Sequence, residues 1–467
     1  ERSGLSGLLA DEMGLGKTLQ TLTWISLART DPEARGKPAL VVCPTSLVQN
    51  WAAEAEKFTP WLRRLVVSGP DRAASFARIP SCDLVITSYA LLQRDLEAAY
   101  LDKTFGVVVL DEAQHIKNRQ TRNAKAAKRL TSVQKLVLTG TPVENSVADV
   151  WSIFDFLLPG YLGQYDAFRA TTQEVIEAGG PEGRAEQEKL HRKLHPFILR
   201  RLKKTVAKDL PDKIVKVAYC PMTPEQQRWY NQLLADARGR IGDMVKAKGF
   251  AKSRMEILAL LMRLRQVASH LELLKEYREK QGARRAGAGA ADGGNALSGK
   301  LEVFLELLDE AIDGGHRVLV FSQFVSMLTI LRRELTARGI RFCYLDGETK
   351  DRLGACRTFN TDASIPLFLI SLHAGGTGLN LTGADMVVHF DPWWNPAVEA
   401  QATDRAHRIG QKRTVYVVKL IAQDSVEERV LALQQKKQLV IDATVGTTDE
   451  AAVQKLTYDD IKSIVGL

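Results

Sequence analysis

The sequence has few cysteines and no long apolar run. Its five cysteines are scattered over 467 residues, and none stands at the spacing of a metal site. An odd, scattered set is typical of reduced thiols, so we expect a cytosolic protein. No apolar run reaches the roughly 18 residues that a membrane-spanning helix needs. The chain opens on Glu1-Arg2, and we expect no signal peptide.

Basic residues are in moderate excess. There are 64 Lys and Arg against 55 Asp and Glu, so the net charge is +9 and the isoelectric point is about 9.2. An excess of positive charge favours a polyanionic partner such as nucleic acid. An apolar share of 45% with 25% charged residues is typical of a soluble globular chain, and the length suggests two large or three smaller domains.

A glycine-bearing loop near the start of the chain is the strongest local signal. The loop at residues 10–18 follows an apolar pair and opens onto apolar residues at helical spacing. A strand, a glycine loop and a helix beginning at Gly-Lys-Thr can hold polyphosphate on backbone N–H groups. Lys17 would then reach the β- and γ-phosphates, and Thr18 would bind Mg²⁺. Because Asp11 replaces the usual first glycine, the motif alone leaves an ordinary glycine-rich turn open.

Strand-like and helix-like segments alternate in the first half. Unbroken apolar runs predict strands at residues 40–43, 84–87, 107–110 and 136–138. Such runs are typical of parallel strands that are covered on both faces. The alternation predicts a doubly wound α/β domain with its functional loops at the carboxyl ends of the strands.

Two adjacent carboxylates, Asp111 and Glu112, follow the third of these strands. At the end of an apolar strand they would be costly to bury unless they met a cation or water. Asp111 is therefore predicted to bind Mg²⁺ opposite Thr18, and Glu112 to position and deprotonate the attacking water. A solvated strand end is the alternative. The Thr-Gly-Thr-Pro turn at 139–142 is predicted to relay between nucleotide and nucleic acid.

The alternation fades in the middle of the chain and then returns. Residues 1–157 are predicted to form the first α/β lobe, and 158–281 to hold helical insertions with a basic connector. The Gly/Ala-rich segment 282–299 predicts a flexible linker between two lobes. Residues 300–440 are predicted to form the second lobe, and 441–467 a C-terminal tail.

The second lobe is predicted to be another parallel α/β unit without a phosphate loop of its own. Its strands are expected at residues 318–321, 342–345, 367–370, 386–390 and 415–418. Two such lobes with one phosphate loop suggest a nucleotide clamped between them. Arg405 and Arg408, three apart on an expected helix, would share one face and suit a γ-phosphate. An exposed cationic helix end is the alternative.

Together the motifs resemble the Swi/Snf-type motor of helicase superfamily two, the chromatin-remodelling family of DNA translocases. The matching strings lie at residues 11–18, 42–51, 111–114, 138–142, 196–201, 318–324, 374–381 and 401–411. The Asp-Glu-Met-Gly-Leu-Gly-Lys-Thr form of the loop also accounts for Asp11. The resemblance implies two tandem RecA-like lobes with helical insertions between them. The Ala-, Arg- and Gly-rich composition favours a bacterial member.

The resemblance also implies roles for matching residues. Nucleotide binding falls to Asp11, Met13, Gly14, Leu15, Gly16, Lys17 and Thr18, with Gly378, Arg405 and Arg408 from the second lobe. Thr18 and, through water, Asp111 would hold Mg²⁺. Glu112 would be the general base, and Gln114 would couple the lobes. The catalytic set would be completed by Lys17, Arg405 and Arg408. DNA contacts are implied for Thr45, Ser46, Gly376, Thr377, Asn380 and Trp394.

The implied activity is ATP- and Mg²⁺-dependent translocation along double-stranded DNA. A strand-separating DNA or RNA helicase is one alternative, and it needs a wedge element that the sequence does not identify. A catalytically decayed nucleic-acid-binding scaffold is another, against which the intact Lys17, Asp111 and Glu112 argue. The family's adenine-reading glutamine motif lies upstream of this chain, so we expect a truncated first lobe. Other protein subunits are expected partners. The protein is expected in the cytoplasm near the nucleoid if it is bacterial, and in the nucleus if it is eukaryotic.

Overall fold

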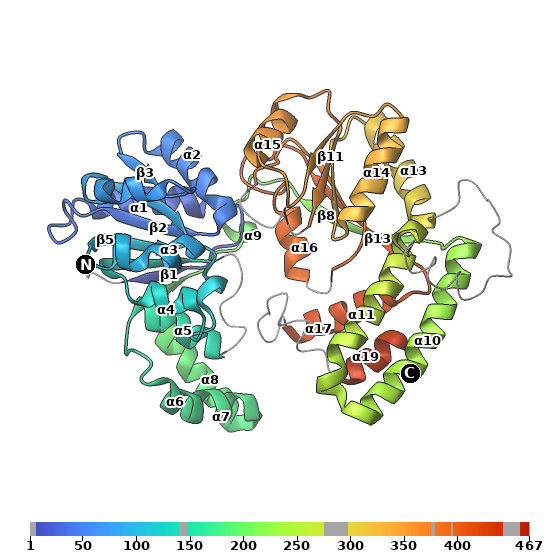
Figure 1. Ribbon diagram of the computed structural model, residues 1–467, viewed down its shortest axis with the longest axis horizontal. Coiled ribbons are helices and arrows are strands. Elements are labelled where there is room, and N and C mark those ends of the chain that lie inside the picture. The colour runs from blue at the N-terminus through green and yellow to red at the C-terminus, as the bar shows by residue number, and fades with distance from the viewer. Residues whose placement is uncertain are drawn as a thin grey trace. The chain divides into compact units, whose positions relative to one another are not determined.

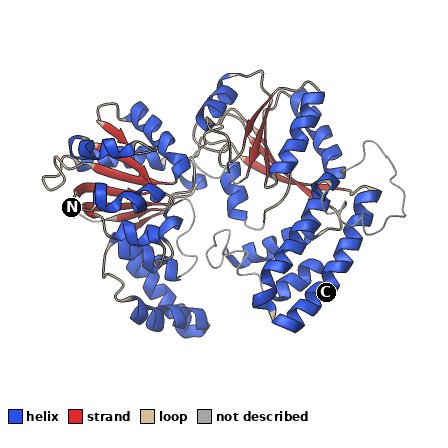
Figure 2. Ribbon diagram, in the orientation of Figure 1, coloured by secondary structure: helices blue, strands red, loops and turns tan. Residues whose placement is uncertain are grey.

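The protein divides into two compact units. The computed structural model describes residues 6–139, 147–274, 298–372, 374, 379–393, 396–441 and 458–466. The first unit runs to Asp209 and the second begins at Leu210. Each unit contains one parallel sheet with helices packed around it (Figures 1 and 2). The sequence had favoured a boundary at 282–299; most of that segment lies outside the described residues, and Gly299 already begins helix α13 (Gly299–Asp313).

The first unit is built on a seven-stranded sheet with the order β3-β4-β2-β5-β6-β1-β7 and parallel neighbours throughout. The strands are β1 (Gly7–Leu9), β2 (Ala39–Cys43), β3 (Arg64–Val66), β4 (Leu84–Ser88), β5 (Thr104–Leu110), β6 (Thr131–Leu138) and β7 (Ile198–Leu199). Every residue of β2 and β4 is buried, as expected for parallel strands covered on both faces. The strands predicted from apolar runs are confirmed. The short strands β3 and β7 were not predicted, because two or three residues carry no periodicity.

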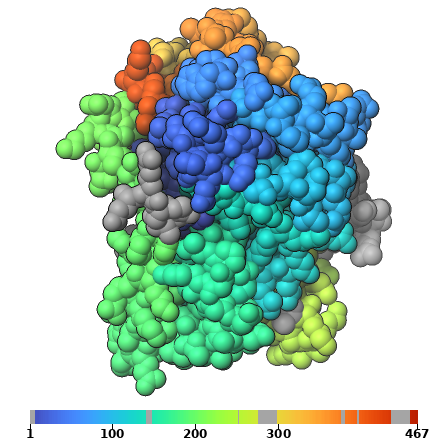
Figure 3. Space-filling view, turned by 90° about the vertical axis from the view of Figure 1, so that its left-hand side faces the viewer, coloured from blue at the N-terminus to red at the C-terminus, as the bar shows by residue number. Residues whose placement is uncertain are grey.

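Two layers of helices cover this sheet. The helices are α1 (Lys17–Ala28), α2 (Val48–Phe58), α3 (Tyr89–Asp95), α4 (Arg122–Lys128), α5 (Val147–Leu157), α6 (Tyr165–Phe168), α7 (Glu174–Ala178), α8 (Gly180–Leu194) and α9 (Lys203–Val206). One core holds Leu22 of α1 and Trp51 of α2, and the other holds Leu92 of α3 and Phe154 of α5. Helices α5 to α8 form a separate end of the unit, teal to green below the blue part (Figures 1 and 3).

The second unit is built on a six-stranded parallel sheet with the order β10-β11-β9-β12-β13-β8. The strands are β8 (Lys213–Cys220), β9 (Val318–Ser322), β10 (Phe342–Leu345), β11 (Leu367–Ser371), β12 (Met386–His389) and β13 (Val415–Ala422). All five predicted strands are present. The sequence missed β8, whose apolar run is interrupted by Lys216 and whose first four residues are exposed. Because β8 pairs with β13, the second unit begins earlier than composition indicated.

A helical bundle is attached to the second sheet. The remaining helices are α10 (Pro224–Lys248), α11 (Phe250–Ser269), α14 (Val325–Ala337), α15 (Arg352–Thr361), α16 (Pro396–Thr403), α17 (Val426–Ile441) and α19 (Tyr458–Val465). One core joins α10, α11, α17 and α19 through Tyr230, Leu261, Val430 and Ile464. The described helices between 158 and 281 are divided between the two units, at Asp209 and Leu210. Among the described helices, none is both long enough and apolar enough to cross a membrane.

Candidate active site

The glycine loop lies where the sequence predicted it, between β1 and α1. Gly14 and Gly16 adopt left-handed φ angles of 84° and 75°, which glycine reaches without steric cost. Helix α1 begins at Lys17, and no side chain of the described residues caps its N-terminus at Gly16. The Lys17 ammonium donates to the Asp11 carbonyl oxygen at 2.6 Å. The loop therefore combines a cation with the uncapped N–H groups of a helix start, an arrangement suited to phosphate.

Asp11 is among the residues predicted to bind nucleotide, and in the structure its side chain is bound within the protein. The residue is completely buried, and Arg201 donates to its carboxylate from the backbone N–H at 3.0 Å and from the guanidinium, with an ion pair of 2.5 Å. Gln20 donates to the same carboxylate at 3.3 Å. The acid that replaces the usual glycine thus fastens the loop to the segment after β7. Any contact of Asp11 with nucleotide would have to come from its backbone.

Neighbouring loop residues are held in the same way. Glu12 accepts a hydrogen bond from the Lys203 backbone N–H at 2.7 Å, and its own N–H donates to the Arg201 carbonyl at 3.0 Å. The Leu15 side chain is buried, and its carbonyl accepts from Gln20 at 2.9 Å. Only the Leu15 backbone therefore remains for the predicted nucleotide contact. Met13 and Thr18 are half-buried at the loop and at the first turn of α1.

The acidic pair follows β5, at the same carboxyl edge of the sheet. Trp51 Nε1 donates to Asp111 Oδ2 at 2.8 Å, and the Tyr89 hydroxyl donates to the Asp111 carbonyl at 2.8 Å. Burial, followed by the negative charge of Glu112, raises the pKa of Asp111 to about 7, while Trp51 and the Lys17 ammonium act in the opposite direction. The acidic pair and the glycine loop follow two strands of one parallel sheet, β5 and β1, and so lie at the same carboxyl edge.

Glu112 is held in an unusual backbone conformation. Its φ and ψ are 53° and 63°, in the left-handed region that non-glycine residues rarely adopt. Such strain is concentrated at functional sites. Gln114 Nε2 donates to Glu112 Oε2 at 3.1 Å and so orients the carboxylate. The buried Oε1 of Gln114 has no hydrogen-bond partner among the described residues.

These donors fit a hydrated magnesium ion. Mg²⁺ prefers oxygen ligands and keeps several waters, so one carboxylate and one hydroxyl are a sufficient protein contribution. Asp111 supplies a buried carboxylate whose pKa is raised by burial and by the negative charge of Glu112. Thr18 supplies a hydroxyl at the start of α1. A divalent cation at this edge would stabilise the ionised form of Asp111.

The predicted DNA-contacting residues of the first unit lie at the same edge of the sheet. Thr45 and Ser46 form a short 3₁₀ turn directly after β2, and both are exposed. Of the turn at 139–142, Thr139 is buried and the other three residues lie outside the described part of the chain. The first unit thus presents two exposed hydroxyl side chains near the end of a central strand.

In the second unit, the predicted arginine pair does not lie on a helix. Helix α16 ends at Thr403, and the chain continues in turns through Arg405 and Arg408. The backbone N–H groups of Arg405 and Ala406 already donate three residues back instead of four. The Arg405 carbonyl accepts a hydrogen bond from the Leu381 N–H at 3.0 Å, outside any helix. Gln411 Nε2 donates to the Ala406 carbonyl at 3.1 Å and caps these turns. The prediction that Arg405 and Arg408 share one face of a helix was therefore wrong.

The structure also describes some of the other residues predicted for the site in the second unit. Arg405 is buried, and Arg408 donates to the Leu379 carbonyl at 3.2 Å. Asn380 is exposed, and its carbonyl accepts from Asn360 Nδ2 at 2.7 Å. The predicted residues Gly376, Thr377, Gly378 and Trp394 lie outside the described residues.

Sequence reasoning missed the residues that support the site. Trp51, Tyr89 and Arg201 each contact an acidic residue of a motif from another part of the chain. Trp51 and Arg201 each fall at the end of a string used for the resemblance, and this is the signal that could have identified them. Their role as partners of Asp111 and Asp11 needs the fold, because the separations are 60 and 190 residues.

Family models and curated relatives match nearly the whole chain. Residues 1–273 match the family model described as the SNF2-related domain, and residues 299–410 match the Helicase conserved C-terminal domain. The putative ATP-dependent helicase/translocase YwqA of Bacillus subtilis is 36% identical over 473 residues, covering 100% of this chain and 49% of the relative. An uncharacterized ATP-dependent helicase of Mycoplasma pneumoniae is 36% identical, covering 99% of this chain and 42% of the relative.

A eukaryotic protein and a solved structure are also similar. The TATA-binding protein-associated factor MOT1 of Saccharomyces cerevisiae is 34% identical, covering 97% of this chain and 27% of the relative. The chain thus spans between about a quarter and a half of the length of these curated relatives. The Sulfolobus solfataricus SWI2/SNF2 ATPase core in complex with dsDNA is 35% identical, covering 99% of this chain and 93% of that chain, with a TM-score of 0.45.

The Asp11–Arg201 pair generates a stability prediction. Arg201→Met removes the partner of a buried carboxylate, and breaking such a pair is expected to cost about 3 kcal/mol. The midpoint of urea unfolding of the first unit should fall accordingly. Lys204→Met, at an exposed position three residues later, should leave the midpoint unchanged. Equal midpoints for the two variants would show that the ion pair does not anchor the loop.

Proposed function

Because this chain belongs to the SNF2-related family, we propose that it is an ATPase motor that translocates along double-stranded DNA. The observation that carries the proposal is that the glycine loop after β1 and the acidic pair after β5 lie at the same edge of the first parallel sheet. This edge joins a phosphate-binding loop to a carboxylate pair, the two parts that ATP hydrolysis requires. Relatives named ATP-dependent helicases and a relative solved with dsDNA support the choice of substrate.

In this proposal the first unit binds ATP and activates water. Lys17 and the N–H groups around Gly16 bind the β- and γ-phosphates. Glu112 accepts a proton from the attacking water, and Gln114 keeps its carboxylate oriented. Mg²⁺, held by Thr18 and Asp111, would neutralise phosphate charge when bound.

The second unit contributes positive charge. Arg405 and Arg408 are proposed as the arginine fingers that stabilise charge on the γ-phosphate as it is transferred. The turns that carry them are fixed by Gln411 and by the bond from Leu381 to the Arg405 carbonyl. A preorganised position is what an electrostatic contribution to catalysis requires.

Thr45, Ser46 and Asn380, all exposed, are proposed to contact the DNA backbone. Contacts to phosphate carry no sequence information, so binding should be insensitive to sequence and should weaken steeply with salt. The net charge of +9 agrees with such a partner. A strand-separating helicase remains the second candidate, favoured by the names of the bacterial relatives.

Hydrolysis rates with different nucleic acids test the proposal. We expect strong stimulation of ATP hydrolysis by duplex DNA and little by single-stranded DNA, duplex RNA or no nucleic acid. The Lys17→Ala variant provides the background rate. Equal or greater stimulation by single strands or RNA would favour the helicase, and ATP binding without stimulated turnover would favour a scaffold.

The role of Glu112 can be separated from binding. Glu112→Gln keeps the size of the side chain but removes the base, so hydrolysis should fall to the Lys17→Ala background while ATP and DNA still bind. Fluorescent-nucleotide titration and steady-state turnover measure the two properties. Glu188→Gln, at an exposed position, is the control. Loss of ATP binding in Glu112→Gln would indicate a structural role instead.

Arg405 should affect turnover rather than folding. Arg405→Ala is expected to lower kcat by about 10³-fold, the lower end of the effect of an arginine finger. Arg357→Ala, which removes an exposed arginine of α15 in the same unit, should retain the normal kcat. A loss of only severalfold at Arg405 would place this residue outside the transition-state contacts.

A further inference from the structure

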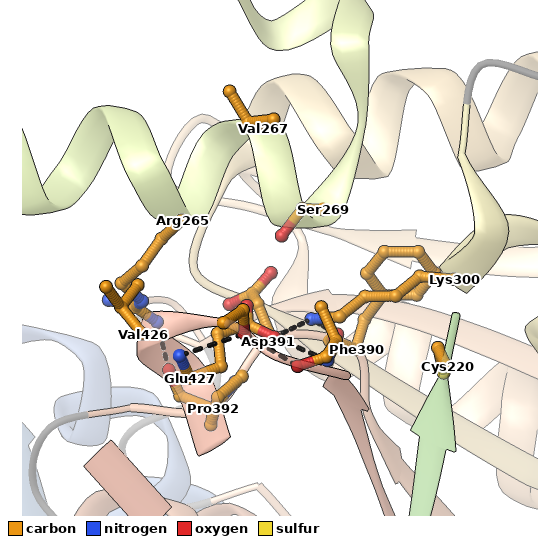
Figure 4. A network of polar contacts seen from close by, with 12 residues as sticks. Cys220, Arg265, Val267, Ser269, Lys300, Phe390, Asp391, Pro392, Val426 and Glu427 are labelled. Atoms are coloured by element: carbon orange, nitrogen blue, oxygen red, sulfur yellow. Dashed lines mark hydrogen bonds and ion pairs between the residues drawn. The ribbon is translucent and has the colours of Figure 1, made fainter. Parts of the chain in front are cut away.

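A cluster of buried charges lies in the second unit, away from the turns that carry Arg405. Its members are Arg265, Lys300, Asp391 and Glu427, none of them more than 2% exposed. They come from α11, α13, the segment after β12 and α17, and Figure 4 shows them converging. Two cations and two anions therefore meet where four elements join.

Lys300 and the carboxylates fix three of these elements. Lys300 Nζ forms an ion pair with Glu427 at 2.5 Å and donates to the Phe390 carbonyl at 3.1 Å. Asp391 accepts from the Gln323 N–H at 2.9 Å and from the Ser322 hydroxyl at 2.5 Å. The start of the 390–393 segment is thus bound to α13 and to the end of β9.

Arg265 holds the other end of the 390–393 segment. Its guanidinium donates to the Pro392 carbonyl and, at 3.1 Å, to Gln323 Oε1. It also lies 5.9 Å from the centre of the Trp393 ring (Figure 4 shows Arg265 above Pro392). A planar guanidinium can make these contacts at the same time, whereas a lysine ammonium cannot reproduce the geometry.

The 390–393 segment in turn positions α16. The Trp393 N–H donates to Glu399 Oε1 at 2.7 Å, and Lys419 pairs with the other oxygen of Glu399. At the end of the helix, His389 Nε2 lies 3.0 Å from the Thr403 hydroxyl. A continuous series of polar contacts therefore leads from α11 to the helix that ends two residues before Arg405.

Burying such charges is a poor route to stability, because well-packed apolar residues often stabilise a protein as much or more. The benefit of these buried charges must therefore come from the positions that they impose on the segments they contact. We propose that Arg265 is a positioning residue for the second unit: it fixes the 390–393 segment and, through Glu399, the helix that presents Arg405. Only the expected effect on catalysis rests on the proposed ATPase function, and the structural role of Arg265 does not.

The test compares Arg265→Lys and Arg265→Met with Arg240→Met, which removes an exposed arginine of α10. Hydrogen exchange of peptides covering residues 390–409 is expected to accelerate in both Arg265 variants, and more there than in the rest of the second unit. With duplex DNA, kcat should fall roughly 10- to 100-fold while KM for ATP stays within about twofold. Arg240→Met should match the wild type in every measurement.

The outcomes separate the two proposals. Normal exchange and normal kcat in Arg265→Lys would overturn the positioning role and leave only charge compensation. If Arg265→Met fails to fold, Arg265→Lys decides. If the wild-type chain does not hydrolyse ATP, the proposed function fails, and the exchange measurement alone then decides whether Arg265 positions α16.

Discussion

The arrangement of this protein depends on parallel sheets that are covered by helices on both faces. A strand such as β2 or β4 has no residue that can carry a polar side chain to solvent. The polar side chains of the candidate site therefore lie in the loops at the strand ends. In the first unit this constraint brings the glycine loop, the 3₁₀ turn after β2 and the acidic pair to a single edge. The chemistry follows from the topology, because in such sheets ligands bind outside the carboxyl ends of the strands.

Burial at this edge also makes its acids dependent on specific partners. Asp111 would be difficult to ionise beside Glu112 without the Trp51 indole and the Lys17 charge. Asp11, which stands where the motif usually has glycine, is completely buried, and Arg201 compensates its negative charge. Each acid is thus paired with a residue remote in sequence. The same pairs hold the phosphate loop and the acidic pair in place, so stability and site geometry have a common origin.

Sequence reasoning was strong where the signal was local. Unbroken apolar runs identified every strand of four or more residues except β8, whose lysines and exposed positions resemble a surface segment. It also identified the loop around Lys17 and the acidic pair. It was wrong about the helix carrying Arg405, where the backbone N–H reaches three residues back and the carbonyl bonds to Leu381 of a separate segment. The pairing of Asp11 with Arg201 was equally invisible, since nothing local indicates a partner 190 residues away.

The Asp11–Arg201 pair and the group of buried charges around Arg265 obey one physical rule. A buried charge is retained at a cost, and the cost is tolerated where an apolar substitute could not direct a backbone segment. Arg201 directs the strand-to-helix loop that carries Lys17, and Arg265 directs the segment that leads to Arg405. The Arg265 guanidinium contacts a backbone carbonyl and a side chain, and Arg201 bonds to Asp11 through both its guanidinium and its own backbone N–H. Each arginine therefore defines a position as well as a charge. Each unit therefore uses a buried arginine contact to hold the element on which its proposed contribution to ATP hydrolysis depends.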